Sequence, residues 1–181
     1  MRCSWVSDDP LYLAYHDQEW GHAVHGDTAL FERISLEAFQ SGLSWLTILR
    51  KRSAFRRAFS DFTPNVVAAF DESKVAALLQ EEGIVRNERK IRATIANANA
   101  LVALQYSHGP DALDALIWSF ATELQPRRAR SQIPTQTPES VRLAKELKNL
   151  GFVFVGPTTM YALMQACGIV DDHEVGCDTW Y

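Results

Sequence analysis

Two pairs of residues that could bind a metal ion lie at opposite ends of the sequence. Cys3 and His16 lie near the start of the 181 residues, and His173 and Cys177 lie near the end. Two thiolates and two imidazoles suit zinc and close a tetrahedral site without a position for water, as in a structural ion. Such an ion would bind only the folded arrangement and would join the two ends of the protein. Either pair could also occur by chance, so this pattern alone does not establish the site.

A second possible site combines a carboxylate with aromatic rings. Glu37 lies in an apolar stretch that breaks at Gly42 and restarts at Ser44, beside Leu43 and Trp45. Where the local dielectric is low, a carboxylate binds a cationic or hydrogen-bond-donating ligand more strongly than it does in water. Taken by itself, Glu37 has a simpler interpretation, which is a position facing the solvent.

Aromatic residues crowd the segment around His16. They are Trp5, Tyr12, Tyr15 and Trp20. Rings on a rigid backbone form platforms for a planar base, and stacking contributes about 1–3 kcal/mol per base. Packing in the core is the competing interpretation, but the polar sequence around Tyr15 and Trp20 is poorly suited to an interior.

The segment 72–105 is typical of two helices joined by a tight turn. The first helix is predicted to end at Gly83, Ile84 follows, and the basic residues Arg86 and Lys90 come close to the start of the second helix. Exposed backbone amides at such a helix start can hold a phosphate without reading sequence. The arrangement resembles a helix-hairpin-helix, although most helix pairs joined through Gly-Ile bind nothing.

The elements that must position these residues are predicted to be helices. Capping residues, prolines at first helical positions and helix-ending glycines indicate six to nine of them, and only residues 152–155 have the composition of a strand. Hydrophobic residues make up 47% of the chain and charged residues 22%, which is typical of a globular protein. We expect one unit over residues 1–181, with a terminal lobe formed by residues 1–25 and 140–181.

Charge and hydropathy narrow the functional classes. A net charge of −4 argues against a protein that coats nucleic acid indiscriminately. Most Lys and Arg residues nevertheless fall in three short segments, which could form a local phosphate-binding stripe or simply solvated helix faces. No apolar run could span a bilayer and no signal peptide follows Met1, so we expect a cytoplasmic protein without a membrane partner. In that reducing compartment, Cys167 is predicted to be a buried apolar residue.

Together these segments resemble the bacterial 3-methyladenine DNA glycosylase I family. The resemblance rests on motifs at residues 3–5, 9–21, 36–45, 83–86, 151–156, 164–168 and 172–173. They follow one another in the family's order along nearly the whole chain. Such a series is far more specific than any single element considered above.

The resemblance implies an all-α helix-hairpin-helix glycosylase that excises 3-methyladenine from alkylated double-stranded DNA, releasing the free base and leaving an abasic site. It implies one structural Zn²⁺ per chain, with four ligands, namely Cys3, His16, His173 and Cys177. It implies that Glu37 is the catalytic carboxylate that recognises the base, that Tyr15 is a hydrogen-bonding wall and that Trp45 is the stacking platform. The rest of the pocket wall is then formed by Trp5, Tyr12 and Trp20.

The DNA contacts are predicted from position. Leu43, at the bend between two helices, is predicted to be an apolar wedge that fills the vacated base step. In the hairpin, the predicted contacts are Gly83, Ile84, Arg86 and Lys90. The larger superfamily usually places an assisting aspartate soon after the hairpin, and this sequence shows no clear candidate there. No lysine nucleophile is indicated, so strand cleavage is not expected, and we expect the protein to act as a monomer.

Two other functional classes remain compatible with the residues. A metal-dependent hydrolase would use the zinc ion directly and would keep one ligand position for water. A zinc-stabilised helical DNA-binding adaptor would bind DNA without turnover, so that the surroundings of Glu37 would not matter.

Overall fold

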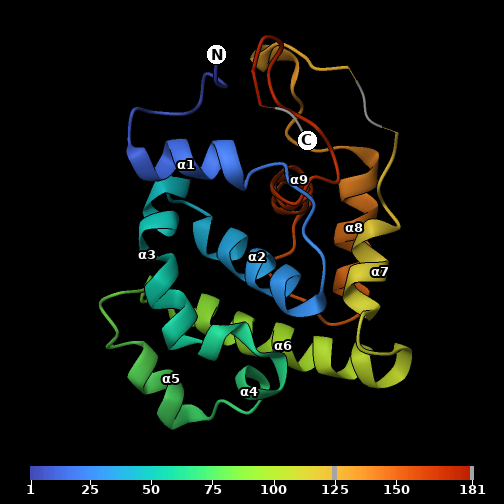
Figure 1. The fold of residues 1–181 in the computed structure, drawn as a ribbon. Helices are drawn as coiled ribbons and strands as arrows, with labels where there is room; N and C mark the ends of the chain where they lie inside the picture. The colour runs from blue at the N-terminus through green and yellow to red at the C-terminus, as the bar shows by residue number, and fades with distance from the viewer. Residues whose placement is uncertain (124–125, 180–181) are drawn as a thin grey trace.

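The computed structural model describes residues 1–123 and 126–179, and in these ranges the regular structure is helical (Figure 1). The α-helices are α1 (Pro10–Gln18), α2 (Asp27–Gln40), α3 (Trp45–Ala58), α4 (Pro64–Ala68), α5 (Glu72–Leu78), α6 (Glu88–His108), α7 (Ala112–Trp118), α8 (Pro138–Asn149) and α9 (Pro157–Ala166). Two 3₁₀ turns are η1 (Ser60–Phe62) and η2 (Arg130–Gln132). The described ranges contain one isolated bridge and no strand, which confirms the all-α prediction. None of the helices described is both long and apolar enough to cross a membrane.

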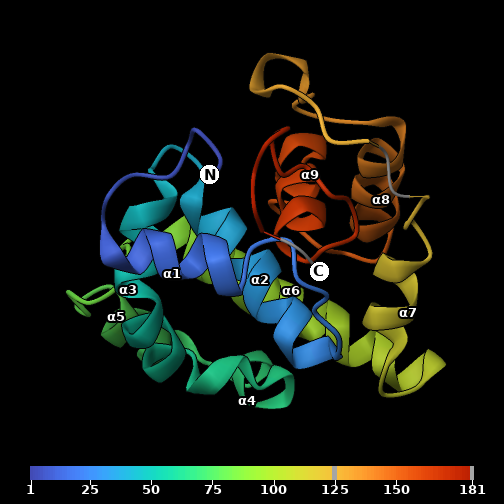
Figure 2. The ribbon, with the colours of Figure 1, turned by 45° about the horizontal axis from the view of Figure 1, so that its top comes forward.

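Helix α2 runs through the middle of the molecule and contacts α3, α6, α7 and α9 (Figures 1 and 2). Its apolar residues recur at helical spacing, and Leu30, Phe31 and Ile34 have no exposed surface. At its start the buried Asp27 carboxylate accepts hydrogen bonds from the backbone N–H of Asp114 and the side chain of Gln105. The helix that carries Glu37 is therefore fixed on several sides.

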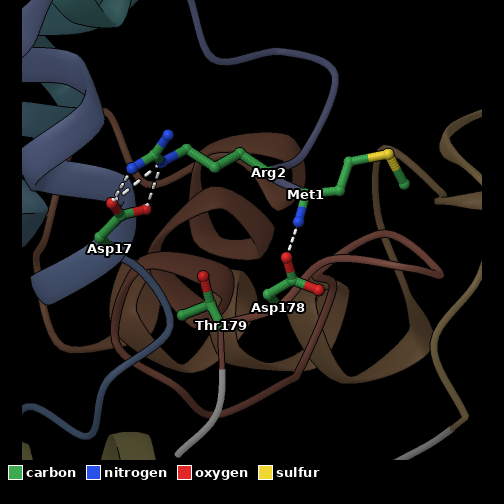
Figure 3. Close-up of a pocket in the computed structure, with 5 residues that line it drawn as sticks. All are labelled: Met1, Arg2, Asp17, Asp178 and Thr179. Carbon is green, nitrogen blue, oxygen red and sulfur yellow. Dashed lines mark hydrogen bonds and ion pairs between the residues drawn. The ribbon is translucent and has the colours of Figure 1, made fainter.

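The two ends of the described chain lie together beside α1 and α9. The backbone N–H and hydroxyl of Ser4 both donate to the Glu174 carboxylate, each at 2.9 Å. Figure 3 shows the ammonium of Met1 paired with Asp178 in a shallow pocket at this junction. This contact agrees with the predicted meeting of the termini. The division into a terminal lobe stays a prediction, and its residues 180–181 lie outside the described residues.

The predicted hairpin corresponds to α5, a connection over residues 79–87, and α6. Gly83 is needed for close packing, because a Cβ atom there would lie 2.6 Å from Cβ of Ala54 on α3. Ile84 is buried in the core, and the Asn87 side chain caps α6 by accepting from the backbone N–H of Lys90. The connection therefore packs against the protein and is not a freely projecting turn.

Candidate functional site

A pocket of about 200 Å³ lies where α1, α2, α3 and α9 meet. Its lining includes all six residues predicted to form the base pocket, which are Trp5, Tyr12, Tyr15, Trp20, Glu37 and Trp45. It also includes residues that the sequence did not single out, which are Gln40, Arg130, Ala162, Gln165 and Asp172. The structure thus brings the predicted set together, although the set is drawn from α1, α2, α3 and the segments on either side of α1.

The aromatic rings form continuous walls. The ring centroid of Trp5 lies 5.1 Å from that of Tyr12 and 5.0 Å from that of Trp20. On the other side Tyr15 packs against Trp45 at 5.4 Å. These separations are typical of packed aromatic pairs, so the rings support one another as well as lining the pocket.

Glu37 is buried, which excludes the solvent-facing interpretation. Its side chain is 6% exposed, and no residue in the described ranges donates a hydrogen bond to its carboxyl group. Burial raises the pKa of Glu37 to about 8, and the positive charge of Arg33, one turn earlier on α2, opposes that rise. Near neutral pH the free carboxyl group therefore keeps its proton, and a cationic ligand would favour the ionised form, to which no protein group in the described ranges already donates.

Trp45 and Tyr15 also present polar groups at the pocket. Ser44 caps α3 by accepting from the backbone N–H of Thr47, which places Trp45 at the first helical position. The Nε1–H group of Trp45 is buried and has no hydrogen-bond partner among the described residues. Burial keeps the pKa of the Tyr15 hydroxyl well above its usual value, so this hydroxyl stays protonated and can donate.

Asp172 is a second buried carboxylate of the pocket, and sequence reasoning missed its role. It is 3% exposed and accepts hydrogen bonds from the Tyr161 hydroxyl, from Nε2 of Gln165 at 2.8 Å and from Arg128 at 2.8 Å. Because Asp172 accepts from the NH₂ group of Gln165, the orientation of that amide is fixed. The i, i+4 spacing of Tyr161 and Gln165 was the available signal, but nothing near them marked a polar network.

The predicted metal ligands converge behind the aromatic wall. The ligand atoms of Cys3, His16 and Cys177 all lie within 4.8 Å of one another, and all three residues are buried. His173 lies outside that group of three, but its ring is 5.3 Å from the ring of His16 and 4.7 Å from that of Trp20. The predicted metal ligands and the pocket therefore share a wall.

The surroundings of these residues fit zinc. Nδ1 of His16 lies 2.8 Å from Asp17, and Nδ1 of His173 lies 2.9 Å from Asp171. A carboxylate on Nδ1 fixes the ring so that Nε2 is the nitrogen that can face a metal, as is common for zinc-binding histidines. The backbone N–H of Glu174 donates to Sγ of Cys3 at 3.3 Å, a contact that suits a thiolate.

The residues predicted to contact DNA fall into two groups. Leu43 is 41% exposed between α2 and α3, and Arg86 is exposed at the end of the connection before α6. Lys90, in contrast, is not at the surface as the basic helix start had suggested. It is 8% exposed, because this turn of α6 faces the end of α2, where Nζ of Lys90 donates to two backbone carbonyls. Ile84 and Gly83 serve packing, as described above.

The chain is similar to known proteins along nearly its whole length. Residues 5–180 match the methyladenine glycosylase family. "DNA-3-methyladenine glycosylase 1" of Escherichia coli (strain K12) is 48% identical over 180 residues, covering 97% of this chain and 95% of the relative. A crystal structure of 3-methyladenine DNA glycosylase I superimposes with a TM-score of 0.94 at 46% identity, covering 98% of both chains.

A further solved structure concerns 3-methyladenine recognition by the Staphylococcus aureus 3-methyladenine DNA glycosylase I. It is 32% identical, with a TM-score of 0.93, and the match covers 98% of this chain and 95% of that one. The family match spans nearly the whole sequence, and the relatives match over almost their full length. The chain belongs to the methyladenine glycosylase family.

Proposed function

We propose that this protein is a DNA-3-methyladenine glycosylase I, which excises 3-methyladenine from alkylated double-stranded DNA by hydrolysing its N-glycosidic bond. The observation that carries the proposal is the buried Glu37 carboxyl, which lacks a protein hydrogen-bond partner in the described ranges and lies in an aromatic-walled pocket. The family membership and the activity named for its relatives support the same conclusion. The product is an abasic site in the DNA and the free base.

The chemistry follows from the charge of the substrate. Adenine methylated at N3 is positively charged while it is attached to the sugar, so it is a good leaving group and departs neutral. Glu37 then accepts a hydrogen bond from the adenine amino group, and the positive charge of the bound base favours the ionised carboxylate. Trp45 stacks on the base and Tyr15 offers a hydroxyl donor. Because the base departs neutral, little acid catalysis is needed. Water forms a bond to C1′ of the sugar as the C1′–N9 bond breaks, and the proton of the water passes to the solvent.

The base must first leave the duplex. Extrusion costs a few kcal/mol and costs less for a damaged or weakly paired base, which itself favours the lesion. Leu43 is the wedge that occupies the vacated step, because it is apolar, exposed and lies in the loop between the helices of Glu37 and Trp45. Arg86 is exposed and has no ion pair among the described residues, so it is available to a DNA phosphate.

A helix-hairpin-helix that holds a DNA phosphate is also part of what we propose. The α5–α6 pair supplies Arg86, but Asn87 already caps the start of α6. Helices α8 and α9 form a second helix pair, which packs more closely than α5 and α6 do. Gly156 at the start of α9 supplies no side-chain cap. A phosphate at the start of α6 or of α9 would be held by backbone amides. Charge reversal at Arg86 tests the start of α6.

A structural zinc ion is also part of the proposal, with Cys3, His16, His173 and Cys177 as ligands. The bound ion would join the ends of the chain and support the pocket wall, and four protein ligands leave no coordination position for a hydrolytic water. Purified protein should carry one zinc per chain. Cys177→Ala should lower zinc content and thermal stability, whereas Cys167→Ala, at a buried thiol outside the cluster, should keep the metal. Full zinc content in Cys177→Ala would overturn the ligand assignment.

One experiment separates the functional classes. The protein is incubated with methylated duplex DNA, and any released base is identified by chromatography. Release of 3-methyladenine with formation of abasic sites is expected. Binding without release would indicate an adaptor. Activity that chelation abolishes while the fold stays intact would indicate a metal-dependent hydrolase.

A further inference from the structure

Helix α2 ends in a different way from the other helices. In each of the other helices that the structure describes, the backbone N–H of the residue after the last turn donates to a carbonyl of that turn. At the end of α2 the residue in this position is Ser41, and it makes no such bond. The last carbonyls of a helix need partners, so the end of α2 must obtain them elsewhere.

Lys90 supplies these partners. Its Nζ donates to the backbone carbonyl of Phe39 at 2.8 Å and to that of Ser41 at 2.6 Å. A cation is favourable at a helix carboxyl end, where the carbonyl dipoles point outward. The side chain is buried, and a buried ammonium is unfavourable unless its hydrogen bonds are made. Lys90 therefore connects α6 firmly to the end of α2.

The contact lies at the root of the loop that carries Leu43. After Ser41 the chain turns through Gly42, which has a φ of +86°, and the backbone N–H of Leu43 donates back to the Gln40 carbonyl. Ser44 then caps α3. The loop thus joins the helix of Glu37 to the helix of Trp45, and Leu43 is its exposed apolar side chain. Its first residue is fixed by a side chain from a helix 49 positions later in the sequence.

We infer that Lys90 is a positioning residue that sets the wedge loop, residues 41–44, in the conformation that extrudes the damaged base. This role rests on the proposed function, because it assigns Leu43 to base extrusion. It also replaces the phosphate contact expected for Lys90. The ammonium acts through the protein, by holding the backbone from which Leu43 projects.

Two steps can be measured separately, namely extrusion of the base from the duplex and binding of the extruded base. A purely structural role of Lys90 would change both steps together. Without the ammonium, the loop should lose its fixed start while Glu37 and Trp45 keep their own supports. Lys90→Met should therefore reduce excision from a fully paired duplex by about tenfold or more. Excision from single-stranded methylated DNA and the affinity for free 3-methyladenine should change by less than about threefold.

Two further variants distinguish a positioning role of Lys90 from a direct phosphate contact. Lys90→Gln keeps one neutral donor and should give an intermediate rate on duplex DNA. Arg86→Met removes the exposed charge that is proposed to contact a phosphate, so it should weaken duplex binding and lower the salt dependence of that binding, whereas Lys90→Met should leave the salt dependence unchanged. Equal loss of salt dependence in both variants would mean that Lys90 contacts phosphate, and would overturn the inference.

A measurement on the protein alone tests the inference even if no base is released by the wild type. Amide hydrogen exchange at Leu43 and Ser44 should become faster in Lys90→Met, while the amides in the centre of α6 stay protected. Unchanged exchange at the loop would overturn the inference. So would a uniform loss of stability in which duplex excision, single-strand excision and base affinity fall by the same factor. Absence of 3-methyladenine release by the wild type would instead overturn the proposed function.

Discussion

Two buried carboxylates line the same pocket and differ in one respect. Asp172 accepts hydrogen bonds from Tyr161, Gln165 and Arg128, whereas Glu37 accepts none from the residues that the structure describes. A buried carboxylate with three donors is part of the scaffold. A buried carboxylate without donors lacks the hydrogen bonds that would offset its loss of water, and a ligand can supply them. The comparison therefore assigns positioning to Asp172 and recognition to Glu37.

The largest effect is expected for excision. Glu37→Gln keeps the size of the side chain but removes its negative charge. It should slow excision of 3-methyladenine by about ten- to a hundredfold, because a charged hydrogen bond contributes about 1.5–3 kcal/mol. Single-turnover rates on alkylated duplex DNA would measure this, with zinc content and circular dichroism as controls. Wild-type rates in a folded Glu37→Gln protein would place recognition elsewhere.

The two carboxylates should also affect stability with opposite signs. The pKa of Glu37 is raised from 4.5 to about 8, so between these values the folded state retains a proton that the unfolded state loses. Wild-type stability should fall as the pH rises through this window and then level off. Glu37→Gln cannot ionise, so it should gain stability relative to the wild type as the pH rises, by up to a few kcal/mol above about pH 8.

Asp172→Ala removes the other buried carboxylate and is compared with Glu37→Gln. It leaves the donors of Tyr161 and Gln165 without their acceptor, so it should destabilise the protein by about 1–3 kcal/mol. Unfolding followed at about pH 5.5 and about pH 8.5, with bound zinc assayed because His173 is adjacent, would measure both variants. If both variants were destabilised alike at high pH, the contrast between the two carboxylates would be lost.

An effect on base binding alone is expected for the stacking wall. Trp45→Ala should weaken the binding of free 3-methyladenine by about 1–3 kcal/mol, because it removes the stacking face and leaves Glu37 in place. Calorimetric titration with the free base would measure it. Trp118→Ala is a control of equal size, since Trp118 packs on His25 outside this pocket. Equal losses in the two variants would indicate a general loosening and not a stacking site.

Residue types and motif order predicted much of this molecule. The helical class followed from capping residues and periodicity, and the lining of the pocket followed from the resemblance, since Trp5, Glu37 and Trp45 do meet. The roles of Asp172 and Lys90 could not be read in this way. A lysine in the first turn of a helix usually faces water, and only the packing of α6 against the end of α2 buries this one. Similarly, Asp172 gains its donors from α9 and from Arg128, 44 positions away.

The meeting of the chain ends has a consequence for the order of folding. Cys177 approaches His16 across 161 positions, so this contact closes a very long loop and should form late. Trp5 packs on His16 and Trp20 on His173, so one wall of the pocket should form only with that last step. We therefore expect an early state in which α2 and its neighbours are packed but the pocket is open on one side. In such a state Glu37 would face water, and selection of a damaged base would begin only once both ends are in place.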